Sequence, residues 1–312
     1  MADTQNEVFK TPVNKIRLFE HGAPGSQNLK LTRKYYTEDM PDGRVKHIVQ
    51  NITDPDIVPY MPDGIGNSTD RQRIPAVLII PGGAFRRLVY NFEGEDVAKW
   101  LNSMGIAAFV LECRLPSDEH DNAEDVPLID AMRAMRVIRG RAQEFGIDEA
   151  KIGVMGFMAA LLSTAYESDV YADYKYKDEY DKLSARPDFA VCSYPVISID
   201  DCIEAGKRYM SEEQVLERIS DSKAKILHKY NPDKLVRPDM PPVFICETDD
   251  DRTTLSENSV GFYMAARKAG VSAELHIFRT GGHGYGCGDD FAQTGEWKVL
   301  FTKWIKSIGI IS

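Results

Sequence analysis

The sequence predicts an α/β fold, in which helices cover a central sheet whose strands are mostly parallel. The first observation is the segment IPAVLII at 74–80, a continuous apolar run rich in branched residues, which is typical of a strand buried on both faces. The second is the alternation of strand-like and helix-like segments that follows it along the chain. Because no linker interrupts the 312 residues, we expect a single domain over 1–312.

The other elements are predicted from hydrophobic periodicity and from turn residues. Residues 1–73 carry two strand-like runs, at 14–18 and 45–52, which we expect to add edge strands to the sheet. A charged amphipathic stretch at 211–230 predicts a small helical cap or insertion over about 198–235. The remaining predicted strands are 106–111, 152–155, 188–194, 243–247 and 273–278, and the remaining helices are 94–104, 127–145, one that opens at Ala159, 257–268 and 297–308.

Composition and charge exclude several classes of function. The formal net charge of −10, without a basic cluster, argues against a nucleic-acid partner. No segment has the unbroken apolar length of a membrane span, and the N-terminal run MADTQNEVFK lacks the apolar core of a secretory signal, so we expect a cytoplasmic protein. The five cysteines are scattered without a C-x-x-C pair, which suggests neither a disulfide framework nor a zinc site, and we expect the three that lie in or beside predicted strands to be small buried hydrophobes.

The segment KIGVMGFMAALLST at 151–164 is where chemistry is expected. A short apolar strand, a turn tightened by Gly156 and a helix opening at Ala159 form the context of a nucleophile elbow, where G-x-S-x-G presents a serine. The apex here is Met158. A thioether has no proton to give up and is at best a weak acceptor, so Met158 cannot attack an acyl carbon as a serine does.

Seven segments in the same order resemble α/β-hydrolases of the acetyl-xylan-esterase and feruloyl-esterase-like group, related to carboxylesterases and lipases. They are PGGAF, ECRLP, PLIDAMRAMRVIR, IGVMGF, ARPDFAVCSYPVIS, DDDRTTLSENSVGFYMAARKAG and GGHGYG, and they span about residues 70–310. The resemblance implies the α/β-hydrolase fold and serine-type hydrolysis of carboxylic esters, without a metal or an organic cofactor. The ligand would be a small ester such as an acylated sugar. Whether the protein forms a homo-oligomer is left open by the resemblance.

In this family the catalytic residues follow the order serine, acid, histidine. The histidine would be His283, which lies in a Gly-Gly-His-Gly turn, and the acid would be Asp251, with Asp249 and Asp250 close enough to compete. The acid would orient the imidazole and stabilise its charged form. The resemblance further implies an oxyanion hole of backbone N–H groups, contributed by Gly82, Gly83, Ala84 and Ala159.

The chain departs from the family pattern at three places. The family commonly has glycine and tyrosine where Ala84 and Phe85 stand, and an apolar, proline-containing turn where this chain has RTTL after Asp251. At the elbow, the family pattern G-F-S-A-G-G-H-L is replaced by GFMAALLS, a shortening by two residues that turns the helix by about 200°. Ser163 lies five residues past the apex, more than one helical turn away, and is not expected to replace the serine.

The sequence therefore predicts a carboxylic ester hydrolase of the carbohydrate esterase type whose activity is weak or lost. One alternative is an inactive protein that retains the pocket as a ligand sensor, and another is hydrolysis by water that His283 activates. The acidic, tyrosine-rich stretch at 169–183 is either a solvated loop or short surface helix, or a rim that stacks tyrosines on a sugar or aryl group.

Overall fold

The computed structural model describes residues 9, 13–64, 73–156, 158–171, 173–208, 210–218, 221–288 and 293–312. Most of the polar N-terminal run, part of the N-terminal region at 65–72, and Phe157 of the elbow lie outside the described residues.

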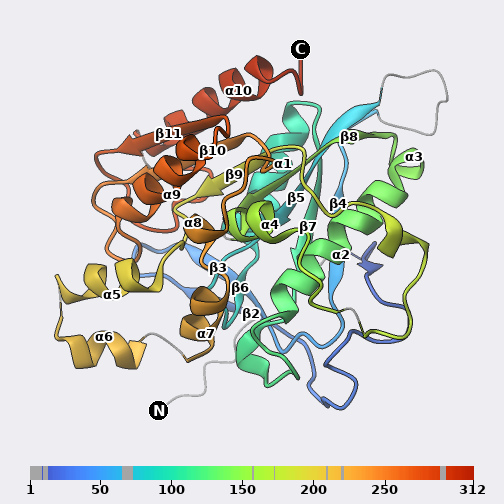
Figure 1. The fold of residues 1–312 in the computed structure, drawn as a ribbon, viewed down its shortest axis with the longest axis horizontal. Helices are drawn as coiled ribbons and strands as arrows, with labels where there is room; N and C mark the ends of the chain where they lie inside the picture. The colour runs from blue at the N-terminus through green and yellow to red at the C-terminus, as the bar shows by residue number, and fades with distance from the viewer. Residues whose placement is uncertain are drawn as a thin grey trace.

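The described residues contain an eight-stranded main sheet (Figure 1). From β7 to β11 its strands are parallel, and β4 and β1 are added antiparallel at one edge. In spatial order the strands are β1 (Ile16–Arg17), β4 (Asp56–Tyr60), β7 (Ala107–Glu112), β5 (Ile74–Ile80), β8 (Ile147–Gly156), β9 (Ala190–Ser193), β10 (Val243–Thr248) and β11 (Ala273–Phe278).

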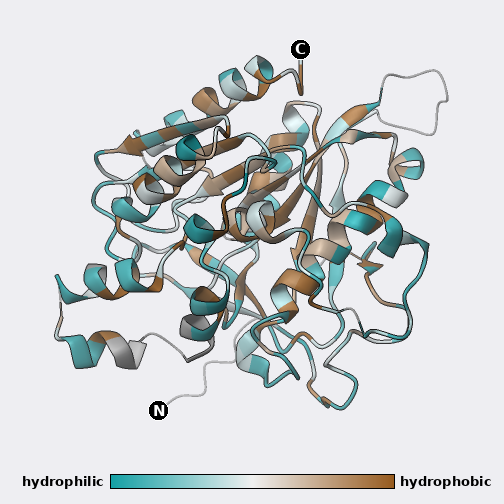
Figure 2. Ribbon diagram, viewed as in Figure 1, coloured by the Kyte–Doolittle hydropathy of each residue, from teal (hydrophilic) through white to brown (hydrophobic). Residues whose placement is uncertain are grey.

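Apolar side chains on both faces of the central strands form the core, as the continuous apolar runs predict. All of β7 and β10 is buried, as is β5 after its first residue, and Figure 2 shows hydrophobic residues concentrated along these strands. Both faces of such a sheet need covering by helices. The mostly parallel sheet with flanking helices confirms the predicted fold class.

The helices pack on the two faces of the sheet. On one face, Trp100 of α1 (Asp96–Ser103) contacts Trp297 of α10 (Trp297–Ser307), with ring centroids 4.8 Å apart. A short π-helical segment (Asn91–Glu95) leads into α1. In Figure 1 the helices α2, α4 and α8 lie in front of the strands. The remaining bounds are α2 (Val126–Gly140), α3 (Ala142–Phe145), α4 (Ala159–Ala165) and α9 (Ser256–Lys268).

The N-terminal region departs from the prediction in one respect. Strand β1 does lie at the edge of the main sheet, but the strand expected at 45–52 does not join it. It forms β3 (Val45–Gln50), which pairs antiparallel with β2 (Lys34–Asp39) and with β6 (Leu88–Val89) in a separate three-stranded sheet. Its sequence VKHIVQ mixes polar and apolar residues, which suits an antiparallel strand buried on one face.

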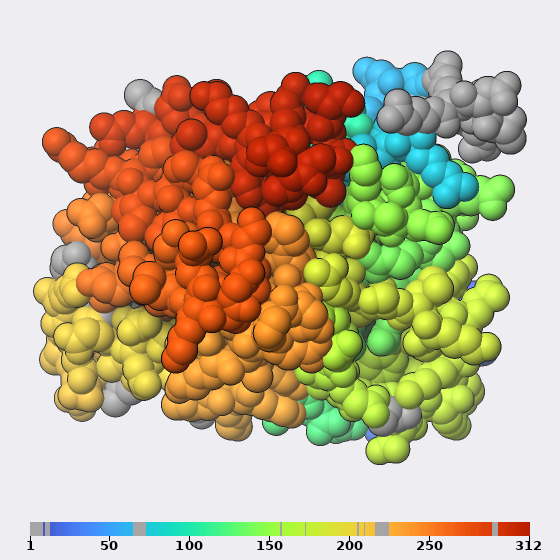
Figure 3. Space-filling view, turned by 45° about the horizontal axis from the view of Figure 1, so that its top comes forward, coloured from blue at the N-terminus to red at the C-terminus, as the bar shows by residue number. Residues whose placement is uncertain are grey.

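The region expected to form a cap-like insertion is helical. It contains α5 (Ile199–Lys207), α6 (Glu212–Arg218), α7 (Asp221–Lys229) and α8 (Pro232–Leu235). A small apolar cluster, separate from the main core, joins α5 and α7 through Ile199, Cys202 and Leu227. In Figure 3 the yellow surface of this insertion borders the orange surface of the chain that follows it. None of the described helices is long and apolar enough to cross a membrane.

Candidate functional site

The segment predicted to form a nucleophile elbow has a strand before Phe157 and a helix after it. Strand β8 ends at Gly156, whose φ of +108° is a conformation that side chains rarely adopt. A Cβ atom there would lie 2.5 Å from the carbonyl oxygen of Ile80 on the neighbouring strand, so only glycine fits. Helix α4 begins at Ala159, three residues after Gly156, and Met158 is its N-cap residue. The short backbone path therefore places residue 158 at the apex.

Met158 is buried at this apex, with 3% of its surface exposed. It lines a cavity of about 10 Å³, no larger than a single water needs, together with Gly82, Gly83 and Cys113. Residue 158 thus lies against the loop predicted to form the oxyanion hole. Its side chain packs there as an apolar group and supplies no nucleophilic atom.

Ser163 does not replace the missing serine. It is fully buried within α4, and its hydroxyl donates a 2.8 Å hydrogen bond to the carbonyl of Ala160 in the same helix. Its hydroxyl is therefore turned into the helix backbone, in agreement with the prediction from its spacing.

His283 and Asp251 lie together, as the resemblance implies. The His283 Nδ1 atom and the Asp251 Oδ2 atom are 2.7 Å apart. Asp251 is 1% exposed and accepts three further hydrogen bonds, from the Thr253 and Thr254 backbone N–H groups (2.6 and 2.9 Å) and from the Thr254 hydroxyl (3.0 Å). Burial would raise the pKa of Asp251, but His283 and the backbone donors outweigh it and hold the pKa below its ordinary value.

The neighbouring carboxylates have other positions. Asp249 and Asp250 are exposed, and the Asp250 carboxylate accepts a 2.8 Å hydrogen bond from the Gly282 N–H. The Thr248 hydroxyl donates to the Gly282 carbonyl at 2.9 Å, so both bonds tie the glycine-rich loop to the end of β10. Asp251, rather than Asp249 or Asp250, is the carboxylate that contacts the His283 imidazole.

The loop after β5 has the conformation expected of an oxyanion hole. Gly83 has φ +141°, and a Cβ atom there would lie 2.1 Å from the Arg87 carbonyl oxygen. Ala84 and Phe85 also have positive φ, 58° and 61°, a conformation that costs a residue other than glycine about 1 kcal/mol or more. Among the described residues, no acceptor takes the N–H of Gly83 or Ala84. Both donors are therefore available to a ligand.

Glu93 is a site residue that the sequence analysis missed. Its Oε2 accepts a 2.6 Å hydrogen bond from the Gly82 N–H, which removes Gly82 from the predicted oxyanion donors. Burial raises the pKa of Glu93, while the nearby His283, the Gly82 N–H and Lys46 act in the opposite direction. Glu93 thus holds the oxyanion loop in place beside the histidine. No local motif marks it, because its partner lies eleven residues earlier in a different element.

Glu247, also missed, lies behind the acid. It is fully buried at the end of β10, and burial together with the negative charge of Asp251 raises its pKa to about 9. Glu247 is therefore protonated at neutral pH, which avoids two adjacent buried negative charges.

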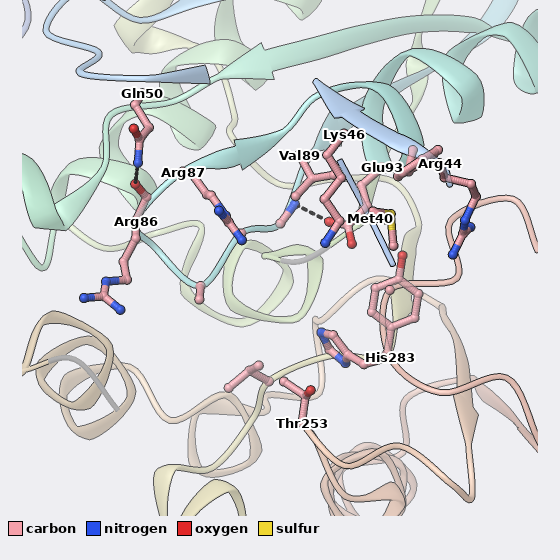
Figure 4. A pocket seen from close by; sticks show the side chains of 17 residues that line it. Met40, Arg44, Lys46, Gln50, Arg86, Arg87, Val89, Glu93, Thr253 and His283 are labelled. Carbon is pink, nitrogen blue, oxygen red and sulfur yellow. Dashed lines mark hydrogen bonds between the residues drawn. The ribbon is translucent and has the colours of Figure 1, made fainter. Parts of the chain in front are cut away.

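His283 lines a pocket of about 610 Å³, whose lining side chains are drawn in Figure 4. The pocket lies between the carboxyl ends of the main-sheet strands and the three-stranded sheet. In the close-up, His283 and Thr253 lie on one side, and Lys46 and Arg87 lie on the other. The Tyr194 ring packs edge-on against the imidazole at a centroid distance of 5.1 Å. A volume of this size lies within the range of small-molecule binding pockets.

The tyrosine-rich stretch lies elsewhere. Tyr171, Tyr174 and Tyr176 line a separate cavity of about 360 Å³ that shares no lining residue with the pocket of His283. The Tyr174 hydroxyl donates to the Gly22 carbonyl at 2.8 Å, and a short 3₁₀ helix (Glu179–Lys182) follows. Of the two interpretations of this stretch, the surface loop with a short helix fits the structure.

The remaining predictions concern cysteines and metals. Burial was predicted for the three cysteines in or beside predicted strands, and in the structure all five cysteines are buried. Among the described residues, no group of three histidine, cysteine, aspartate or glutamate side chains is arranged to hold a metal ion.

Comparisons with known proteins agree with this geometry. A sequence model of the BD-FAE family matches residues 63–265. An acetylxylan esterase of Xylanibacter ruminicola is 30% identical over 240 residues, which are 75% of this chain and 45% of that protein. An endo-1,4-β-xylanase of Butyrivibrio fibrisolvens is 31% identical over 69% of this chain and 33% of its own length. The chain thus spans less than half the length of these curated relatives.

Solved structures that are similar to this chain have the same fold. An acetyl ester-xyloside bifunctional hydrolase from Caldicellulosiruptor lactoaceticus is 36% identical, with a TM-score of 0.67 over 83% of this chain and 90% of that one. An esterase from Thermogutta terrifontis, 22% identical, has a TM-score of 0.64 over 93% of this chain and 96% of that one, and shows the fold alone.

The fold and the arrangement of the site define an α/β-hydrolase. Within that class, the chain belongs to the BD-FAE family, and it is similar in sequence to an acetylxylan esterase.

Proposed function

We propose that this chain binds acylated sugars and hydrolyses their ester bonds slowly, by attack of water rather than through a serine acyl-enzyme. The observation that carries the proposal is the combination of Met158 at the apex with a His283–Asp251 pair that faces a pocket of about 610 Å³. The names of two relatives, an acetylxylan esterase and an acetyl ester-xyloside hydrolase, support a sugar ester as the ligand.

The residues present suffice for a single-displacement reaction. With its Nδ1–H held by Asp251, His283 accepts a proton from water at Nε2 while the water oxygen attacks the acyl carbon. The N–H groups of Gly83 and Ala84 stabilise the oxyanion that forms. The tetrahedral intermediate then collapses, the bond to the sugar oxygen breaks, and the departing alcohol takes the proton from His283. The products are the free acid and the sugar alcohol.

The rate should be far below that of a serine esterase. In proteases, removal of the nucleophile lowers turnover by about a millionfold, equivalent to roughly 8 kcal/mol of barrier. What remains comes from binding, from the oxyanion hole and from the positioned base.

The test is hydrolysis of p-nitrophenyl acetate and of an acetylated xylo-oligosaccharide by the protein, by His283→Ala and by Met158→Ser. We expect slow turnover without a burst, its loss in His283→Ala, and faster turnover with a burst in Met158→Ser. His276→Ala is the matched control, because His276 lies on β11, pairs with Glu274 at 2.8 Å and is outside the pocket. Turnover that survives His283→Ala, or a burst in the unaltered protein, would contradict the proposal.

A second candidate function is a ligand-binding protein without turnover. It is favoured by the placement of Met158, which lines its own small cavity and is not among the residues that line the pocket with His283. In that case an acetylated sugar should raise the melting temperature, while neither the protein nor Met158→Ser hydrolyses it. Measurable turnover that depends on His283 would exclude this candidate.

A further inference from the structure

The wall of the pocket opposite His283 is strongly basic, in contrast to the rest of the chain. The protein has a formal net charge of −10, yet the pocket is lined by Arg44, Lys46, Arg86 and Arg87 with Glu93 as its one lining carboxylate among the described residues. All four cations belong to the small three-stranded sheet or to the loops that enter its strands. Figure 4 shows them along one side of the pocket.

Two of these cations have acidic partners on their own sheet. The Arg87 guanidinium contacts both carboxylate oxygens of Glu38, at 2.6 and 2.7 Å. The Arg44 guanidinium forms an ion pair with Asp42 at 2.8 Å. Both arginines therefore contribute little net positive charge to the pocket.

The other two cations have no such partner. Lys46 and Arg86 form no ion pair with any carboxylate among the described residues. The Lys46 ammonium is partly buried, whereas Arg86 is exposed at one end of the pocket. Glu93 balances Lys46 only in part, because burial raises the pKa of Glu93 and its carboxylate is already bonded to the Gly82 N–H. A partly buried lysine that no carboxylate balances fully favours an anionic ligand.

We propose that the sugar ester bound in this pocket is acidic, with the carboxylate of a uronic acid unit held by Lys46 while the ester lies at His283. This inference rests on the proposed function, since it names the substrate class of the same site. A singly charged carboxylate fits better than a phosphate, because Glu93 would repel a dianion. The ester and the carboxylate belong to different parts of the ligand, since the basic wall and the His283 imidazole lie on opposite sides of the pocket.

The test is calorimetric titration of the intact protein with two acetylated xylo-oligosaccharides of equal length, one neutral and one carrying a single glucuronic acid unit. We expect the acidic ligand to bind about tenfold more tightly or more, the effect of one charge-assisted hydrogen bond. The preference should shrink at high salt. In Lys46→Gln the affinity for the acidic ligand should fall while that for the neutral ligand is unchanged.

Lys34→Gln is the matched control, because Lys34 is an exposed lysine on β2 of the same sheet that does not line the pocket, and it should retain the preference. If Lys46→Gln does not fold, the salt dependence of the preference in the unaltered protein keeps the test informative. Equal affinity for the two ligands, an equal loss for both in Lys46→Gln, or tighter binding of a xylose phosphate would overturn the inference and leave the proposed function standing. Failure of both oligosaccharides to bind would overturn the proposed function as well.

Discussion

Replacing Asp251 by asparagine tests whether its charge, rather than its shape, holds the site together. The side chain accepts four hydrogen bonds, from His283 Nδ1, from the Thr254 hydroxyl and from the backbone N–H groups of Thr253 and Thr254. The amide oxygen of an asparagine can still accept the two backbone N–H groups, which both contact Oδ1. Its NH₂ group, however, would face the Nδ1–H of His283.

The magnitude follows from these contacts. A hydrogen bond to a charged group contributes about 1.5 to 3 kcal/mol, and the variant loses the bond to His283 and weakens the rest, so we expect a cost of roughly 3 kcal/mol at neutral pH. For a chain of this size that is a fall in melting temperature of roughly 5 °C. Because the folded-state pKa of Asp251 is lowered, its stabilisation is present above the ordinary pKa and is lost as the pH falls through the folded value.

The assay is urea unfolding of the protein and of the Asp251→Asn variant at neutral pH and at a pH well below the ordinary carboxyl pKa. Asp250→Asn is the control, because Asp250 is exposed and accepts a single bond from the Gly282 N–H, which an amide oxygen can keep. The control should cost less than about 1 kcal/mol. If Asp251→Asn costs no more than Asp250→Asn, or costs as much in acid as at neutral pH, the reasoning is wrong.

Two further predictions concern buried positions around the site. Glu247 stays protonated in the folded protein and ionises on unfolding. The free energy of unfolding should therefore fall by up to about 1.4 kcal/mol per pH unit between the ordinary pKa of a glutamate and about 9. Glu247→Gln should remove this slope in unfolding curves recorded across that range, and an unchanged slope would contradict the assignment. Gly156→Ala should cost about 3 kcal/mol or more, since its Cβ would lie 2.5 Å from the Ile80 carbonyl, whereas Gly261→Ala in α9, where nothing lies within 4 Å, should be neutral or stabilising by up to about 1 kcal/mol. Similar melting temperatures for the two glycine variants would refute the steric argument.

Several elements of the main sheet and its flanking helices were predictable from sequence almost residue by residue. The predicted strands 74–80 and 273–278 coincide with β5 and β11, and the predicted helix at 257–268 differs from α9 by one residue. In these segments local pattern and tertiary burial point the same way. The strand at 45–52 was placed in the wrong sheet, because pairing partners are set by contacts distant in sequence, and its partner β6 has only two residues.

The candidate site, too, was predictable from sequence only in part. His283 and Asp251 could be assigned because each lies in a recognisable segment, and the structure brings their side chains together. Glu93 and the basic wall could not be predicted, because their position depends on how the three-stranded sheet lies over the end of the main sheet. Lys46 lies on a strand that mixes polar and apolar residues, and nothing in its neighbouring sequence indicates that its side chain lines a pocket.

The supports of the site do not depend on residue 158. Asp251 is fixed by Thr253 and Thr254, and the histidine loop is fixed by bonds to Thr248 and Asp250.

The loop that carries the oxyanion donors is fixed by the bond from the Gly82 N–H to Glu93. None of these bonds involves Met158, so a methionine at residue 158 leaves His283, Asp251 and the loop at Gly82–Ala84 in position. The same independence gives the Met158→Ser experiment its meaning: a serine added at the apex meets a site already assembled, and the rate it restores measures how far the shortened elbow has displaced residue 158 from His283.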